Sequence, residues 1–186
     1  IRSYVKQGGT FVTTYFSGYV EDHDLVVLGG YPGKLRDILG VWVEEIDALY
    51  PDEANSFIYK GVRYPAEIAC ERKHLEGAEA LAFYESDFYA GMPVVTRHAW
   101  GRGEAYHVAT RSNGAFYKAF LRDLCENHRI RPAADTPEGV EATVRKNEKG
   151  ECLFLLNHNS QEVSVCLESG GTELLTGTVA VLFRPE

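Results

Sequence analysis

A segment with two prolines, residues 131–137, divides the sequence into two parts with different hydrophobic patterns. Beyond it, apolar residues alternate at period two in short segments separated by glycine-containing turns at 148–150 and 169–171; the segments are 140–146, 152–158, 163–167, 172–175 and 179–183. Five short alternating segments predict a small antiparallel β-sandwich or barrel. We therefore expect two domains, residues 1–133 and residues 134–186.

The part before the prolines mixes helical and strand patterns. Residues 1–7 have the pattern of the last two turns of an amphipathic helix, which Gly8 and Gly9 end before the strand-like run 10–16. A helix that leads directly into a buried strand is typical of an α/β repeat. Because no capping residue precedes this helix, we also expect the chain to be a piece of a longer protein.

Further elements follow the same rules. The apolar runs 41–46 and 80–84 predict strands, and the run from Pro32 to Leu39 predicts a short helix that Gly40 ends. Segments 93–99 and 104–110 flank a glycine-rich turn and predict a β-hairpin. Residues 113–128 form the clearest helical pattern, while residues 47–78 predict only short strands and excursions.

Charge and composition exclude several classes of protein. Nineteen Lys and Arg against 27 Asp and Glu give a net charge of −8, which disfavours binding to nucleic acid. The sequence has no apolar run of about 18 residues and no signal peptide, so we expect no membrane partner. Without a secretory signal, reduced cysteines and a cytoplasmic location are expected. Whether Cys152 and Cys166 face each other is not decided by the pattern.

The residue types that carry most enzyme chemistry lack the spacing that this chemistry needs. Neither Cys70 nor Cys125 has the flanking small residues of a nucleophile elbow. The six histidines form no zinc-binding pair on a helix, and the glycines of 101–103 join two strands instead of leading into a phosphate-binding helix. We therefore predict no catalytic, cofactor-binding or metal-binding residue in this chain.

Two other readings stay open. Glu85 and Asp87 would be the acid/base pair if the chain were an enzyme in its own right, although adjacent surface acids are usually only solvated. Trp42 or Trp100 would be the stacking platform if the chain were a carbohydrate-binding accessory module.

Several segments in order along the chain resemble the C-terminal part of the β-galactosidases of glycoside hydrolase family 42. The resemblance covers nearly the whole chain and is carried by residues 4–18, 28–40, 87–97, 101–110, 154–158 and 170–176. It implies a partial, N-terminally truncated α/β domain of the amidotransferase-like (flavodoxin-like) fold that mediates trimerisation, followed by the small antiparallel β-sandwich domain. One departure is His98, where asparagine is expected more often.

The same resemblance implies a function. The parent would hydrolyse terminal β-D-galactosides with a (β/α)₈ barrel that this chain lacks, so the galactoside would bind outside this chain. The chain itself would be a non-catalytic assembly segment within a homotrimer. Phe88, Tyr89 and Tyr31 are the residues that we expect at the subunit interface.

Overall fold

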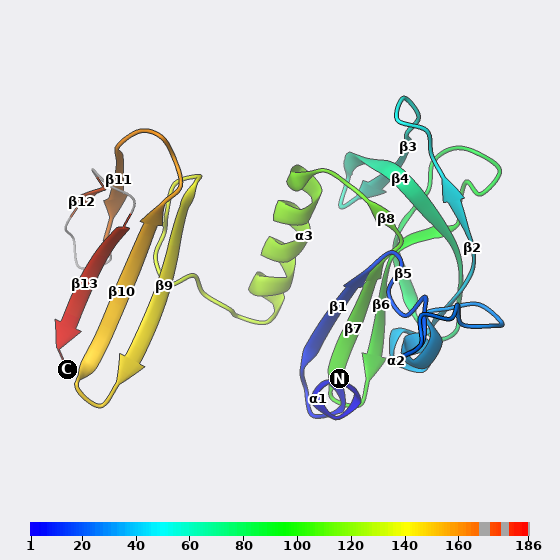
Figure 1. The fold of residues 1–186 in the computed structure, drawn as a ribbon, viewed down its shortest axis with the longest axis horizontal. Helices are drawn as coiled ribbons and strands as arrows, with labels where there is room; N and C mark the ends of the chain where they lie inside the picture. Colours follow the sequence, from blue (N-terminus) through cyan, green and yellow to red (C-terminus); the bar gives the residue numbers. More distant parts are fainter. Residues whose placement is uncertain (168–171, 176–178, 186) are drawn as a thin grey trace. The chain divides into compact units, whose positions relative to one another are not determined.

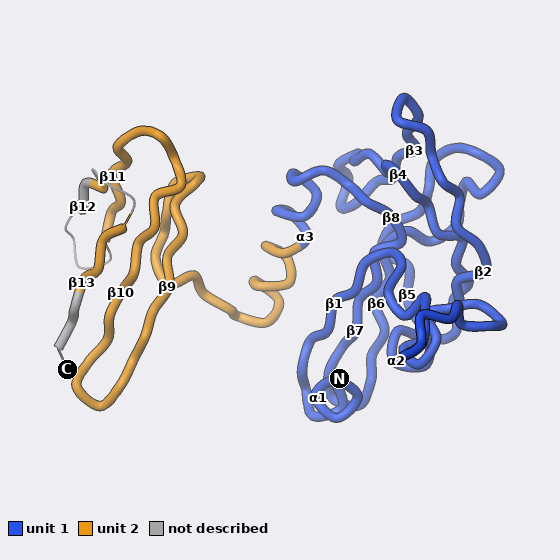
Figure 2. The backbone as a smooth tube through the Cα atoms, viewed as in Figure 1, with its two compact units in different colours: residues 1–120 blue, residues 121–186 orange. Residues whose placement is uncertain are grey.

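The computed structural model describes residues 1–167, 172–175 and 179–185. It consists of two compact units, residues 1–120 and residues 121–186 (Figure 2). The predicted domain boundary at residue 133 stays a prediction. No helix in the described part of the chain is both long and apolar enough to cross a bilayer.

The first sheet of unit 1 has the strand order β1-β7-β6-β5 (Figure 1). These strands are β1 (Thr10–Thr14), β5 (Glu79–Phe83), β6 (Pro93–Trp100) and β7 (Gly103–Val108). Strand β1 runs parallel to β7, whereas β6 is antiparallel to both β5 and β7. Trp100 pairs with Gly103 at the turn between β6 and β7, so the predicted hairpin is confirmed.

The second sheet of unit 1 is built around one long strand. It contains β2 (Val41–Ala48), β3 (Asn55–Tyr59) and β4 (Val62–Leu75), with β4 in the middle, and the short β8 (Thr110–Arg111) also pairs with β4. All of these pairings are antiparallel. A continuous strand of 14 residues thus replaces the short strands and excursions that we expected over much of 47–78.

Unit 1 contains three short helical segments, α1 (Arg2–Lys6), η1 (Gly33–Leu35) and α2 (Arg36–Leu39). A longer helix, α3 (Gly114–Asn127), begins in unit 1 and ends in unit 2. Gly40 ends α2 in the left-handed conformation, with φ at +60°. At the start of α3, the Phe116 N–H donates to Asn113 Oδ1 over 3.0 Å, which caps the helix. The buried Phe116 ring then packs edge-on against Phe57, with centroids 5.0 Å apart.

Unit 2 contains two antiparallel sheets. Strands β9 (Val140–Asn147), β10 (Gly150–Asn157) and β13 (Val179–Pro185) form one, and β11 (Val163–Cys166) and β12 (Thr172–Leu175) form the other. Both sheets contribute to one core, which contains Ala134, Val140, Leu153, Leu155, Val165 and Leu175. The predicted turn at 169–171 lies outside the described residues. Cys152 and Cys166 lie in different sheets, and all four cysteines are free.

The expected flavodoxin-like α/β fold is wrong. Strands make up about 48% of the chain and helices about 15%, and the strands are mostly antiparallel. The only parallel pair among the described strands joins β1 to β7. The physical reason is connectivity, because short turns join β3 to β4 and β6 to β7, and a tight turn joins antiparallel strands, whereas parallel neighbours need a crossover.

Candidate functional site

The structure separates the three residues that we expected at a subunit interface. Phe88 is 71% exposed, whereas Tyr31 is 4% and Tyr89 is 1% exposed. The Tyr89 hydroxyl donates to Asp47 Oδ2 over 2.8 Å, and its ring contacts Tyr84. Of the three, Phe88 is the one that presents its side chain to solvent. Its role at an interface stays a prediction.

Tyr31 is the last residue of a segment that exposes several large apolar side chains. Residues 16–31, which we call the apolar loop, expose several large hydrophobic side chains: Phe16, Val20, Leu25, Val26 and Leu28. Leu28 is 95% exposed. A pocket of about 240 Å³ lies beside the loop, lined in part by Val20, Val27 and Leu35. The exposed residues Glu21, Asp22 and Asp24 lie between the exposed apolar side chains, so the surface of the loop mixes apolar and acidic groups. Several exposed apolar side chains in one short segment indicate an interaction site more than an isolated exposed leucine does.

The apolar loop is joined to the rest of unit 1 at its two ends. At the first, the Phe16 N–H donates to Glu71 Oε1 over 2.7 Å. At the second, the backbones of Tyr31 and Val43 exchange two hydrogen bonds, and the indole N–H of Trp42 donates to the Gly29 carbonyl over 3.0 Å. Most side chains between these ends are exposed, so contacts at the ends determine where the loop lies.

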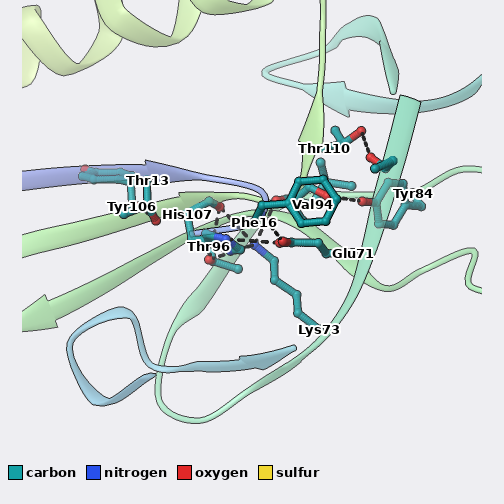
Figure 3. A network of polar contacts seen from close by, with 12 residues as sticks. Thr13, Phe16, Glu71, Lys73, Tyr84, Val94, Thr96, Tyr106, His107 and Thr110 are labelled. Atoms are coloured by element: carbon teal, nitrogen blue, oxygen red, sulfur yellow. Dashed lines mark hydrogen bonds and ion pairs between the residues drawn. The ribbon is translucent and has the colours of Figure 1, made fainter. Parts of the chain in front are cut away.

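Glu71 belongs to a cluster of buried charged groups between β4 and the β6–β7 hairpin. Glu71 and Lys73 point from β4 toward His107 of β7, as Figure 3 shows. Alternation along β4 puts both residues on one face. Glu71 and Lys73 are 0% exposed and His107 is 1% exposed. We call these three residues the buried charge cluster.

Lys73 makes the most contacts in this cluster. Its ammonium donates to the carbonyls of Val94 and His107, at 2.9 and 3.0 Å, and to Thr96 Oγ1 at 3.1 Å. It also lies 3.2 Å from His107 Nδ1. The other ring nitrogen, His107 Nε2, lies 3.2 Å from Glu71 Oε2, close but not aligned as a hydrogen bond.

Burial controls how these groups ionise. It lowers the pKa of Lys73 to about 7, and the negative charge of Glu71 opposes that shift. Burial and the charge of Lys73 lower the pKa of His107, against the opposing effect of Glu71. The same carboxylate adds to burial in raising the pKa of Tyr31 and of Tyr84. The cluster therefore changes charge near neutral pH.

Perturbed pKa values of this size occur in catalytic sites, but the geometry here does not admit a substrate. All three side chains are at most 1% exposed, and their polar atoms point at one another and at backbone carbonyls. Among the described residues, no three His, Cys, Asp or Glu side chains are placed to hold a metal ion. The arrangement can hold fixed charge inside the domain and fasten the start of the apolar loop.

The predicted alternatives for chemistry find no support in the geometry. The Glu85 carboxylate accepts two hydrogen bonds from Arg63, at 2.7 and 2.9 Å, and its pKa is lowered by that partner. A general acid needs a raised pKa, so Glu85 is poorly suited to pair with Asp87. Asp87 is also poorly placed for catalysis, because its Oδ1 accepts a hydrogen bond from the backbone N–H of the next residue, Phe88, over 2.6 Å.

The two tryptophans are also engaged within unit 1. The Trp42 ring stacks on His74 with centroids 5.0 Å apart and contacts the Arg36 guanidinium at 5.5 Å. Trp100 packs against a core cluster that includes Val5 and Ile38. A sugar platform needs an open aromatic face. The Trp42 ring is covered by His74, whereas the half-buried Trp100 also lines a pocket of about 570 Å³.

Glu71 and Lys73 were not predicted as site residues. They stand in the run Glu71-Arg72-Lys73, in which consecutive charged residues occupy both faces of a strand, a pattern typical of a solvated segment. Only the partner strands make the face of Glu71 and Lys73 an interior one. His107 of β7 pairs with Thr96 of β6.

Comparison with known proteins identifies two matching families of domain. Residues 1–131 match the β-galactosidase trimerisation domain, and residues 139–181 match the β-galactosidase C-terminal domain. The chain is 47% identical over 183 residues to the β-galactosidase BgaA of Planococcus sp. (strain 'SOS Orange'), covering 95% of this chain and 27% of that protein. It is 42% identical over 188 residues to the β-galactosidase Pbg of Clostridium perfringens, with 95% and 27% covered.

Solved structures agree with these matches. The cold-adapted β-galactosidase from Rahnella sp. R3 superposes with a TM-score of 0.89 at 39% identity, over 99% of this chain and 30% of that one. A β-galactosidase from Bacillus circulans superposes with a TM-score of 0.88 at 39% identity, over 98% and 30%. The chain thus spans about 27% of the length of the curated relatives named above.

Proposed function

Because the chain belongs to glycoside hydrolase family 42, the β-galactosidases, we propose that it is the non-catalytic assembly segment of an enzyme that hydrolyses terminal β-D-galactosides. The observation that carries this proposal is the match of residues 1–131 to a trimerisation domain. The chain spans only about 27% of its relatives, and its buried charge cluster has no access for a substrate. In this proposal, hydrolysis belongs to the barrel domain that the family resemblance implies.

We place the contact between subunits on one continuous strip of unit 1. The strip begins at the apolar loop, follows the outer face of the β2–β4 pair and ends at Phe88. Along the strip, the Trp42 indole donates to Gly29, the His74 ring stacks on Trp42, and Glu44 Oε2 lies 2.9 Å from His74 Nε2. We call this surface the assembly strip.

Arg72 completes the strip. Its guanidinium lies 3.6 Å from Glu44 Oε2, also pairs with Glu45, and sits 5.1 Å from the centre of the exposed Phe88 ring. The strip thus combines exposed apolar ends with aromatic and arginine side chains, residue types that are enriched in subunit contacts. A stable contact needs on the order of 800 Å² from each partner. We propose that a second copy of this chain covers the strip in a homotrimer.

Light scattering on a sizing column tests this proposal. We expect a solution mass of about 62 kDa, three times the 20.8 kDa of one chain. Leu28→Glu and Phe88→Glu put a charge at either end of the strip and should each shift the mass toward that of a single chain. Val62→Glu, at an exposed position on β4, is the matched control and should leave the trimer intact. A monomer at every concentration would contradict the assembly role.

Activity provides a second test. The purified chain should not hydrolyse a nitrophenyl β-galactoside, and turnover above background would overturn the non-catalytic assignment. Saturable binding of lactose that is lost on Trp100→Ala would favour the carbohydrate-binding alternative instead. We also propose a cytoplasmic location, which the four free thiols support because reduced cysteines are usual there.

A further inference from the structure

One buried carboxylate contacts the first end of the apolar loop, and its charge acts on a side chain at the second end. Glu71 Oε1 accepts the Phe16 N–H at the first end. At the other end, the Tyr31 ring is 4% exposed, its hydroxyl has no hydrogen-bond partner among the described residues, and the charge of Glu71 acts on that phenol. Tyr19, from inside the loop, packs edge-on against Tyr31 at 5.2 Å. One residue of β4 thus lies at the base of a segment of 16 residues.

The first end of the loop needs such a contact. Phe16 has φ at +64°, a left-handed conformation that a residue with a side chain rarely adopts. Strained backbone persists only where its surroundings hold it. Here the N–H of the strained residue itself donates to Glu71. A hydrogen bond to an ionised acceptor is roughly twice as strong as a neutral one.

Several titratable groups face Glu71. Lys73 lies two residues along β4, and His107 approaches from β7, with Nε2 3.2 Å from Oε2. Two phenols, Tyr31 before η1 and Tyr84 at the end of β5, also feel its charge. Among these neighbours Lys73 supplies the positive charge that balances the carboxylate. Figure 3 shows how closely Glu71, His107 and the backbone of Phe16 converge.

We propose that Glu71 is a buried anchor whose charged carboxylate holds the apolar loop against the sheet, and that loss of this charge releases the loop while the sheet stays folded. The loop is suited to independent opening, because most of its side chains are exposed and local opening takes place where few apolar contacts hold a segment. Glu71 acts here as a positioning residue for a surface, independently of which partner that surface binds.

Hydrogen exchange read by mass spectrometry at one pH tests the anchor. In Glu71→Gln the side chain keeps an acceptor oxygen and its size but loses its charge. We expect amides of the loop, such as those of Phe16 and Val27, to exchange about tenfold faster, while the amides of β6 and β7 keep their rates. Glu67→Gln, the same change on the same strand outside the cluster, should alter neither region.

A second readout follows the far end of the loop. Because the Trp42 indole donates to Gly29, its fluorescence in a Trp100→Phe background should shift on Glu71→Gln and not on Glu67→Gln. If Glu71→Gln alone does not fold, the pair Glu71→Gln with Lys73→Met leaves no unpaired buried charge, and the same loop-selective exchange is expected. Unchanged exchange in the loop, or equal acceleration in the loop and in β6–β7, would overturn the proposal.

Discussion

Replacing Lys73 by methionine should flatten the pH dependence of the stability of unit 1 between pH 7 and pH 9. The Lys73 side chain is fully buried, and burial lowers its pKa from an ordinary value of 10.5 to about 7. In the unfolded chain the same amine keeps its ordinary pKa. Between these two values the unfolded state binds more protons than the folded state, so the free energy of unfolding rises with pH.

The magnitude follows from those two pKa values. Integrating the linkage relation from pH 7 to pH 9 gives about 2 kcal/mol of added stability for one such lysine. His107 does not contribute in this window, because its pKa is lowered from 6.5 and its effect lies at more acid pH. Burial raises the pKa of the Cys70 thiol from 9.0 and those of Tyr31 and Tyr84 from 10, so the unfolded chain loses these protons first and stability falls as pH rises through 9 and 10. The window therefore ends at pH 9.

Urea unfolding followed by tryptophan fluorescence measures this dependence, because both tryptophans, Trp42 and Trp100, lie in unit 1. Wild type should gain about 2 kcal/mol from pH 7 to pH 9 through Lys73, and Lys73→Met should lose that gain. Lys118→Met, which replaces an exposed lysine of the same unit, should keep it. The reasoning is refuted if Lys73→Met retains the wild-type slope, or if Lys118→Met loses it as well.

Three further predictions concern packing. Phe116→Ala removes a fully buried ring and should lower the free energy of unfolding by about 3–5 kcal/mol in the same urea assay. Gly40→Ala should lower the free energy of unfolding by more than about 1 kcal/mol, because φ is +60° and the new Cβ would lie 2.7 Å from the His98 ring. Its control is Gly114→Ala, where an added Cβ has no neighbour within 4 Å. Leu153→Ala should destabilise unit 2 by about 2–5 kcal/mol, measured by calorimetry, and a loss below about 1 kcal/mol would contradict its burial.

The elements that the sequence predicted well are those specified by neighbours along the chain. The β6–β7 hairpin needs only two alternating runs and a glycine turn, and α3 needs only its cap and an apolar stripe. The same holds for the strands of unit 2 from Val140 onward. In each case the residues that carry the signal lie within about 15 positions, so no knowledge of distant contacts is required.

Strand β4 was missed because its buried face is not apolar. At Glu71 and Lys73 a charged residue occupies an interior position, so polar residues occur on both faces and the alternation of hydrophobicity disappears. What makes those positions tolerable is a set of partners from β6, β7 and the start of the apolar loop. Partners that distant in sequence leave no local pattern.

The interface residues illustrate the same limit. Phe88 and Tyr89 are adjacent aromatics in one turn-rich segment, and nothing in the local sequence separates them. Tyr89 is buried because its hydroxyl reaches Asp47 of β2, whereas the Phe88 ring lies outside on Arg72 of β4. Exposure of an aromatic side chain in a turn depends on strands that lie more than ten residues away.

These observations together explain why a charged cluster is buried in this domain at all. A loop most of whose apolar side chains point to solvent gains little from burial, so the hydrophobic effect holds it only weakly. Polar contacts at its ends then matter more, and they are strongest where water is excluded. Burying Lys73 and Glu71 destabilises the folded state, yet it provides a firm acceptor for the Phe16 N–H. In our proposal the exposed apolar surface and the buried carboxylate are thus two parts of one arrangement, in which Glu71 holds the first end of the loop and the contacts of Tyr31 and Trp42 hold the second.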